Sequence, residues 1–300
     1  MILNIYQVDS FTKNIFSGNP AGVVSNADGL SEKQMQQIAR ELNNSETAFI
    51  FSSQTDDYDV HVRFFTPLKE VPICGHATIA AHYVRAVENN FQNKMRVYQK
   101  TGAGILPVDI ENNGESYRIT MTQGKVEFED IIEGENLATL KKSLCITSDD
   151  LIDKAPVQIV STGHSKVMIG LNKYDVVHNL KPNFQMLSDL SNKIGCNGYY
   201  VYTFDKAAEN TLVTGRMFAP AIGINEDPVT GNANGPLGAY LVKYNLTPND
   251  GKCLKFNARQ GVTINREGII AVEVAIEERL PVSVKVSGEA VIVFKTQIEI

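Results

Sequence analysis

Two short segments of the sequence carry residue types that suit proton transfer beside a carboxylate, and they resemble each other. The segments are Glu70-Val71-Pro72-Ile73-Cys74-Gly75-His76-Ala77 and Glu226-Asp227-Pro228-Val229-Thr230-Gly231-Asn232-Ala233. Upstream of them lies a second matched pair, Arg63-Phe64-Phe65-Thr66-Pro67 and Arg216-Met217-Phe218-Ala219-Pro220. Two ordered matches at nearly constant spacing indicate an internal duplication, with halves of about 150 residues, a typical domain size.

Each repeated segment is predicted to lead from a strand into a helix that begins near a glycine, Gly75 or Gly231. The first backbone N–H groups of a helix lack a partner within the helix and carry partial positive charge, and glycine lets a ligand approach them. Each segment therefore predicts an anion site suited to a carboxylate, although either one alone could be an ordinary strand-to-helix turn. Two such sites, one from each half, favour a ligand held in a cleft between two lobes.

Three titratable side chains could move a proton on such a ligand or orient it. Glu46 stands between a predicted helix and a predicted strand, where a carboxylate is either solvated or directed into a cleft. By residue type alone the solvated state is the more frequent, whereas a glutamate withdrawn from water would gain basicity. His76 and Asp227 belong to opposite segments and could hydrogen-bond substrate hydroxyl or amino groups. Without a function, His76 would face solvent at a helix start and Asp227 would be a turn residue.

The elements that must position these residues follow from hydrophobic periodicity. In the first half we predict strands at 4–11, 47–51, 60–65, 94–101, 104–110 and 117–123, and helices after the capping box Ser31 to Gln34 and at 77–87. In the second half we predict strands at 157–162, 166–171 and 199–204, helices at 136–144, 183–194 and 233–244, and three further strands between 268 and 294. The fold class is therefore α+β, largely antiparallel, in two pseudo-symmetric lobes. The lobes comprise residues 1–124, which the last strand at 289–300 could join, and 125–288.

The duplication also pairs residues of the two halves. The turn at His164 matches the turn at Asn19, and Gly198 stands where the first half has Glu46. Only one half then supplies this carboxylate, which indicates one acid/base group. Asn19 could offer its amide to a polar substrate, although by turn chemistry alone it is an ordinary turn residue.

Composition restricts the partners and the location of the protein. The chain has 300 residues and a formal net charge of −6, with 43% hydrophobic residues, enough for a sizeable core in two domains. The lack of Lys/Arg runs and of a long apolar run argues against nucleic acid and membrane as partners. The sequence contains no GxGxxG, Walker A or GxSxG motif, which argues against a nucleotide-binding protein and a serine hydrolase. The start does not resemble a signal peptide, and four scattered cysteines predict reduced thiols, a cytoplasmic location and no structural zinc.

Together, the motifs resemble those of the PhzF-like phenazine-biosynthesis family, within the diaminopimelate epimerase-like superfamily. They are Asn19-Pro20-Ala21, Ser45-Glu46-Thr47-Ala48-Phe49, Phe65-Thr66-Pro67, Cys74-Gly75-His76-Ala77-Thr78, Gly163-His164-Ser165 and the segment from Glu226 to Ala233. The resemblance covers essentially the whole chain. It implies that each lobe is a curled, mostly antiparallel sheet around a central helix, with the site between the lobes. It also implies a biosynthetic isomerase that uses neither cofactor nor metal and often forms a homodimer.

The resemblance further implies roles for individual residues. Glu46 matches the family's acid/base glutamate, and His76 and Asp227 match its polar site residues. The expected substrate-binding residues are Asn19, Gly75, His164, Thr230, Gly231 and Asn232. Among these, the two glycines and Asn232 match the cradle of the substrate carboxylate. The authentic phenazine enzyme has serine at the place of Asn232, a change expected to affect the choice of substrate.

Three functions fit these residues. The leading one is a cofactor-independent isomerase that moves a proton within a small carboxylic acid, with Glu46 as the acid/base. The second is an epimerase or dehydratase of a hydroxy- or amino acid that uses Cys74 and Thr230, which occupy the two positions where the superfamily's epimerases have cysteines. A thiol at a helix N-terminus can be activated, although a small buried apolar residue is the more common role of cysteine. The third is a non-catalytic carboxylate-binding protein.

Overall fold

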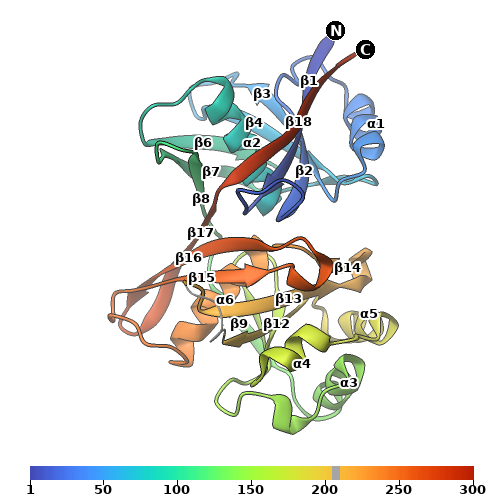
Figure 1. Ribbon diagram of the computed structural model, residues 1–300, viewed down its shortest axis with the longest axis vertical. Helices are drawn as coiled ribbons and strands as arrows, with labels where there is room; N and C mark the ends of the chain where they lie inside the picture. The colour runs from blue at the N-terminus through green and yellow to red at the C-terminus, as the bar shows by residue number, and fades with distance from the viewer. Residues whose placement is uncertain (205–209) are drawn as a thin grey trace. The chain divides into compact units, whose positions relative to one another are not determined.

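The computed structural model describes residues 1–204 and 210–300, and the chain divides into two compact units. The first unit comprises Met1–Thr122 with Ser287–Ile300, and the second comprises Gln123–Val286. The last strand of the chain thus belongs with the first unit (Figure 1). Among the helices in the described part of the chain, none is long and apolar enough to cross a membrane.

The first unit combines a mixed, mostly antiparallel sheet with two helices. Its strands are β1 (Ile2–Ser10), β2 (Asn19–Val24), β3 (Thr47–Ser52), β4 (Val60–Phe65), β5 (Glu70–Val71), β6 (Met95–Thr101), β7 (Gly104–Asn112), β8 (Tyr117–Thr122) and β18 (Ala290–Glu299). Its helices are α1 (Glu32–Leu42) and α2 (Gly75–Glu88). The predicted capping box forms at α1, where Ser31 and Gln34 bond reciprocally, and Asn43 ends the helix in the left-handed region at φ 52°.

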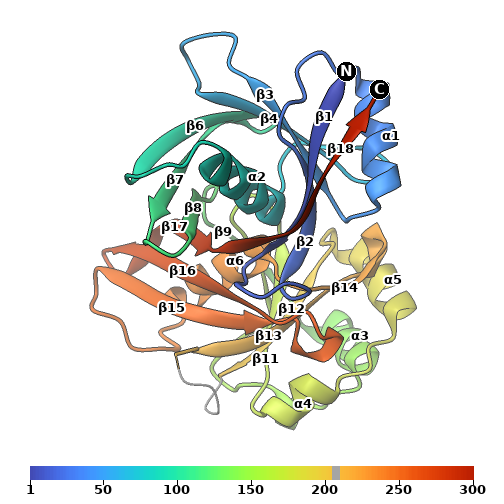
Figure 2. The ribbon, with the colours of Figure 1, turned by 45° about the horizontal axis from the view of Figure 1, so that its top comes forward.

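The sheet of the first unit curls around α2. Its strands follow the order β18-β1-β2-β3-β4-β6-β7-β8, in which β2–β3 and β4–β6 are parallel and the other neighbours antiparallel. Helix α2 packs against β1, β2, β3, β8 and β18 and is buried on nearly all sides. Figure 2 shows α2 between the strands β1 and β18 and the strands β6 to β8. The expected central helix is confirmed.

The second unit contains more helices. Its strands are β9 (Glu127–Ile131), β10 (Gln158–Ser161), β11 (Lys166–Gly170), β12 (Tyr199–Phe204), β13 (Val213–Ala219), β14 (Ile224–Asp227), β15 (Cys253–Gln260), β16 (Gly268–Glu277) and most of β17 (Leu280–Gly288). Its α-helices are α3 (Gly134–Leu144), α4 (Tyr174–Asn179), α5 (Phe184–Ile194) and α6 (Gly231–Lys243), and its short 3-10 helices are η1 (Ser148–Asp150), η2 (Pro220–Ile222) and η3 (Val262–Ile264).

The second unit repeats the strand order of the first. The order β9-β10-β11-β12-β13-β15-β16, with β11–β12 and β13–β15 parallel, matches β18-β1-β2-β3-β4-β6-β7 pair by pair. Helix α6 takes the place of α2 and packs against β10, β11, β15 and β16. The predicted α+β class with two pseudo-symmetric halves is therefore confirmed.

In each unit, an arginine and a glutamate form two hydrogen bonds across the hairpin that leads into the central helix. We call each such pair an arginine–glutamate clamp. In the first unit Arg63 on β4 bonds both carboxylate oxygens of Glu70 on β5, at 2.7 and 2.6 Å. In the second unit Arg216 on β13 bonds both oxygens of Glu226 on β14, at 2.9 and 2.7 Å. Two parallel charge-assisted bonds fix both the distance and the plane of a pair, so each hairpin is held before its helix begins.

The two clamps differ in burial. Side-chain exposure is 9% for both partners of the Arg216–Glu226 clamp, against 22% and 37% for Arg63 and Glu70. Arg216 also donates from Nη1 to three carbonyl oxygens at the end of α4, those of Val177, His178 and Leu180.

We predict that Arg216→Met lowers the free energy of unfolding by about 3–5 kcal/mol, because it leaves a buried carboxylate unpaired. The matched change Arg63→Met should cost about 1 kcal/mol or less, because that clamp is more exposed. Urea denaturation of both variants measures the difference. Equal losses would show that burial does not set the strength of the clamps.

Stability should also depend on His82, a buried histidine in the middle of α2. Its Nδ1 accepts a hydrogen bond from Arg85 at 3.2 Å, and its Nε2 donates to Gln99 at 2.9 Å. Burial, aided by the charge of Arg85, lowers the pKa of His82 to about 3 from its ordinary 6.5. Below pH 6.5 the unfolded chain therefore binds a proton at His82 that the folded chain does not bind. The free energy of unfolding should fall as the pH drops from 6.5 towards 3.

Replacing His82 with glutamine should flatten this part of the pH–stability curve, measured by urea unfolding at several pH values. The wild type, unfolded at the same pH values, is the reference for this slope. An unchanged slope in His82→Gln would contradict the assignment.

Candidate active site

A histidine at the start of α2 links a carboxylate and a thiol. Nε2 of His76 lies 3.4 Å from the carboxylate of Glu46 and 3.3 Å from Oγ of Ser45. Its Nδ1 lies 3.4 Å from Sγ of Cys74. The side chains of His76 and Glu46 are only 9% and 17% exposed. The solvent-exposed alternatives for these two residues are therefore wrong, because tertiary neighbours cover both.

Backbone contacts fix this cluster. The carbonyl of Glu46 accepts from the N–H of Gly22 at 3.3 Å, where the parallel pair β2–β3 begins. The carbonyl of His76 accepts from Oγ of Ser10 at 2.8 Å. Cys74 is the N-cap residue of α2 and has an extended backbone, which lets its side chain reach the ring of His76. Ser10 and Ser45 were not among the predicted site residues, since hydroxyl contacts of this kind leave no spacing signal.

The start of α2 is open to an anion. No described residue accepts a hydrogen bond from the N–H groups of Gly75, His76 or Ala77. A Cβ atom placed on Gly75 would meet nothing within 4 Å. These N–H groups combine the partial charge of a helix start with space for a ligand, as an anion site requires.

In the second unit, a hydrogen-bond network holds Asp227 at the end of β14. The hydroxyl of Thr230 donates to the carboxylate of Asp227, and Nε2 of Gln260 donates to the backbone carbonyl of Asp227 at 2.8 Å and to Oγ1 of Thr230 at 3.1 Å. Oε1 of Gln260 accepts from the N–H of Thr230 at 3.2 Å. Asp227 is thus a buried, positioned carboxylate, 8% exposed, and more than a turn residue. Gln260 was missed because it lies on a strand distant in sequence.

Another unpredicted glutamine orients the start of α6. Nε2 of Gln123 donates to the carbonyl of Gly231 at 3.0 Å and to Oδ1 of Asn232 at 3.3 Å, and its Oε1 accepts from Thr162 at 2.7 Å. The N–H groups of Gly231 and Asn232 have no acceptor in the part of the chain that the structure describes. The second helix start therefore also offers donors to an anion.

The remaining two predicted residues, Asn19 and His164, occupy equivalent positions relative to the sheets of the two units. In β2, Gly22 pairs with the first residue of β3, and in β11, Val167 pairs with the first residue of β12. Asn19 and His164 each lie three residues before these positions. Asn19 is fully buried at the start of β2, whereas His164 lies in an exposed turn. Partial burial, and next the charge of Lys166, lowers the pKa of His164.

The structure thus forms one cluster at each helix start. The first contains Glu46, Cys74, Gly75 and His76, and the second contains Asp227, Thr230, Gly231 and Asn232. One ligand atom each from Glu46, Cys74 and His76 lies within 4.8 Å of the others, so of the described residues these could hold a metal ion. The same distances also suit transfer of a proton between neighbouring groups.

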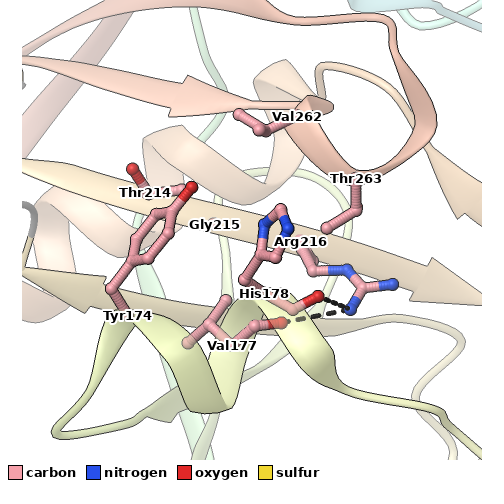
Figure 3. A pocket seen from close by; sticks show the side chains of 8 residues that line it. All are labelled: Tyr174, Val177, His178, Thr214, Gly215, Arg216, Val262 and Thr263. Carbon is pink, nitrogen blue, oxygen red and sulfur yellow. Dashed lines mark hydrogen bonds between the residues drawn. The ribbon is translucent and has the colours of Figure 1, made fainter.

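The cavity in Figure 3 lies elsewhere in the second unit, beside Arg216, and its lining includes Tyr174, His178 and Thr263. The guanidinium of Arg216 points to the carbonyls of Val177 and His178 in this view (Figure 3). Since this arginine is already bonded to Glu226 and to α4, the cavity is part of the clamp and its surroundings.

Comparisons with known proteins agree with this architecture. A model of the phenazine biosynthesis-like proteins (PhzC-PhzF) matches residues 8–296. The chain belongs to this family. An uncharacterized isomerase of Clostridium acetobutylicum is 60% identical over 98% of this chain and 97% of its own length. The uncharacterized isomerase YddE of Escherichia coli is 49% identical, again over 98% and 97%. A solved PhzF family protein from Bacillus anthracis matches with a TM-score of 0.90 at 31% identity, over 100% of both chains.

The resemblance inferred from the motifs is therefore confirmed, and the protein is an isomerase of the PhzF-like type. Its relatives are also named isomerases, which is consistent with a small molecule as the substrate.

We predict that Gly75→Ala and Gly231→Ala keep or slightly raise the melting temperature. Neither glycine has a positive φ, and the nearest atom to an added Cβ is 3.6 Å away, at Gly231. A matching Gly→Ala change stabilises by about 0.4–1 kcal/mol. Gly235→Ala should instead lower the melting temperature, because its Cβ would lie 1.7 Å from Oε1 of Gln123. Thermal unfolding distinguishes the three.

The same melts, repeated with benzoate, test the anion sites. A ligand that binds the folded chain raises its melting temperature. This rise should be smaller in Gly75→Ala and Gly231→Ala than in the wild type, because the added methyl group takes up space next to the N–H donors that a ligand would otherwise occupy. A rise equal to that of the wild type in both variants would argue against anion binding at the helix starts.

Proposed function

We propose that this protein is a cofactor-independent isomerase that moves a proton within a small carboxylic acid, with Glu46 as the acid/base group. One observation carries the proposal. The carboxylate of Glu46, 17% exposed, lies beside His76 at a helix start whose first N–H groups have no acceptor in the described chain. A base and a site for developing negative charge are thereby adjacent.

The reaction then needs two proton transfers by one carboxylate. Glu46 takes a proton from a carbon of the substrate, and the electron pair of that C–H bond forms a new double bond towards an electron-withdrawing group. The negative charge that develops is stabilised by the N–H groups of Gly75, His76 and Ala77. Glu46 then returns the proton to a different carbon, which moves the double bond and leaves the atoms of the substrate unchanged in number.

His76 has a positioning role in this scheme. Its ring touches the carboxylate of Glu46 on one side and the thiol of Cys74 on the other. It therefore fixes the direction of the carboxylate and can hydrogen-bond it between the two transfers.

The proposal extends to the second unit, as the family resemblance implies: the substrate binds between the lobes. Asp227 would accept a hydrogen bond from a substrate hydroxyl or amino group, and Gly231 and Asn232 would hold a carboxylate. The network of Gln260 and Gln123 supports these roles, because it fixes the side chains of Asp227 and Asn232. We also carry over from the resemblance a cytoplasmic, biosynthetic enzyme that forms a homodimer.

The contact between Cys74 and His76 also supports a second candidate, an epimerase or dehydratase of a hydroxy- or amino acid. A thiol 3.4 Å from an imidazole nitrogen can lose its proton to the ring. Its expected partner Thr230 is less suited, because its hydroxyl already donates to Asp227. The third candidate, a non-catalytic carboxylate-binding protein, is disfavoured because the relatives are named isomerases.

We predict that Glu46→Gln abolishes deuterium uptake by the substrate in heavy water, followed by NMR. The panel is dihydro-hydroxyanthranilate with a set of hydroxy- and amino acids. The loss should be about 100-fold or more, the usual contribution of a positioned acid/base group. Glu41→Gln, an exposed residue of α1, is the matched control and should retain the wild-type rate.

Cys74→Ser separates the two catalytic candidates. The isomerase proposal expects exchange to persist in Cys74→Ser and to vanish in Glu46→Gln. The reverse pattern would transfer the chemistry to Cys74 and favour the epimerase or dehydratase.

A further inference from the structure

Within the second unit, one residue occupies the place that Glu46 has in the first. The N–H of Val167 donates to the carbonyl of Gly198 at 2.8 Å where β11–β12 begins, just as Gly22 donates to Glu46 where β2–β3 begins. Gly198 is therefore the structural counterpart of Glu46 and has no side chain to offer. The neighbouring strand supplies one.

The side chain of Lys166, the first residue of β11, lies over Gly198. A Cβ atom on this glycine would be 2.3 Å from Cδ and 2.8 Å from Cε of Lys166. The lysine stem thus fills the space into which a side chain at position 198 would project. At equivalent places of the two sheets, the first unit presents a carboxylate and the second an ammonium group.

This ammonium group is buried and incompletely paired. Lys166 is 8% exposed, and its Nζ donates to the carbonyl of Ser165 at 3.0 Å. It forms no ion pair with any described residue, although an ammonium has three N–H donors. A buried cation without a counter-ion is costly, so an anion that reached Nζ would stabilise it.

Both acidic and basic groups lie around Lys166. Burial lowers the pKa of Lys166, whereas Cys196 and Asp227 act in the opposite direction. His164 lies in the turn before β11, and Glu129 accepts a hydrogen bond from the adjacent Ser165. Of these groups Asp227 belongs to the site described above, at the end of β14 and just before α6, and α6 packs against β11, the strand of Lys166.

We propose that Lys166 is an anion-binding residue that pairs with the carboxylate of a small hydroxy- or amino acid beside Asp227. The ligand class rests on the proposed function. Lys166 binds the negative group, while Asp227 accepts a hydrogen bond from the hydroxyl or amino group. The substrate of this isomerase is then an acid that carries such a group near its carboxylate, and not a simple unsubstituted acid.

The test uses salicylate, benzoate and inorganic phosphate as probes, with calorimetry on the wild type, Lys166→Met, Gly198→Ala and Lys125→Met. Lys166→Met should weaken salicylate binding at least tenfold. Gly198→Ala should do so too, because its Cβ displaces the lysine stem but leaves the charge. Lys125→Met removes an 85% exposed lysine of the same unit and should bind as the wild type does.

The melting temperature of Lys166→Met shows whether Lys166 serves ligand binding or the stability of the fold. Replacing a buried, unpaired charge by an apolar side chain of similar length is neutral or stabilising. Lys166→Met should therefore melt at or above the wild-type temperature while it loses salicylate. As a readout that needs no variant to fold, NMR of 13C-labelled lysine in the wild type should show a rise in the pKa of Lys166 on saturation with salicylate.

Four results would overturn the proposal: unchanged salicylate affinity in both Lys166→Met and Gly198→Ala, no response of the Lys166 signal, no binding of salicylate to the wild type at tens of millimolar, or phosphate or benzoate binding as tightly as salicylate. Glu46→Gln should keep the Lys166-dependent binding. If that binding is present but no acid exchanges deuterium with the wild type, the proposed function fails and this inference stands.

Discussion

The fork-shaped contact between an arginine and a glutamate is the constraint on which both candidate sites depend. Arg63 with Glu70 and Arg216 with Glu226 each close a hairpin a few residues before a helix begins. Because the contact fixes both distance and plane, the chain enters α2 and α6 at a set place. The second hairpin is three residues longer and contains η2, yet its clamp has the same geometry. The loop absorbs the insertion, and the helix start remains open to a ligand.

Duplication of this framework leaves the chemistry free to differ between the units. The strand order and the parallel pairs are the same, but the side chains at equivalent places are not. Where the first unit has a glutamate, the second has a glycine covered by a lysine, and the cysteine at one helix start corresponds to a threonine at the other. These differences are Glu46 and Gly198, Ala21 and Lys166, Cys74 and Thr230, and His76 and Asn232. A scaffold with internal symmetry can in this way carry a carboxylate in one half and an ammonium group in the other.

The parts of the fold that could be predicted are those that local sequence patterns determine. The capping box at Ser31 and the glycine-led helices were predictable because they depend on neighbours in sequence. No element was predicted between 124 and 135, yet this stretch contains β9, which is mostly exposed and therefore has little apolar pattern. Helix α4 has six residues, too few for a periodic face. Strand β15 does alternate in burial, at Leu254, Phe256 and Ala258, and this signal could have been read.

The site could be predicted only where its residues belong to a motif. Their partners come from distant segments, and the burial of Glu46 results from tertiary packing, which cannot be inferred from the residue type.

The ring of His76 shows why these contacts matter. A neutral imidazole has a single N–H. When Nε2 carries it, the ring donates to the carboxylate of Glu46. When Nδ1 carries it, the ring donates to the thiol of Cys74 and no longer to Glu46. In the proposed function, the thiol would therefore influence the reaction through the tautomer of His76, even with Glu46 as the group that moves the proton.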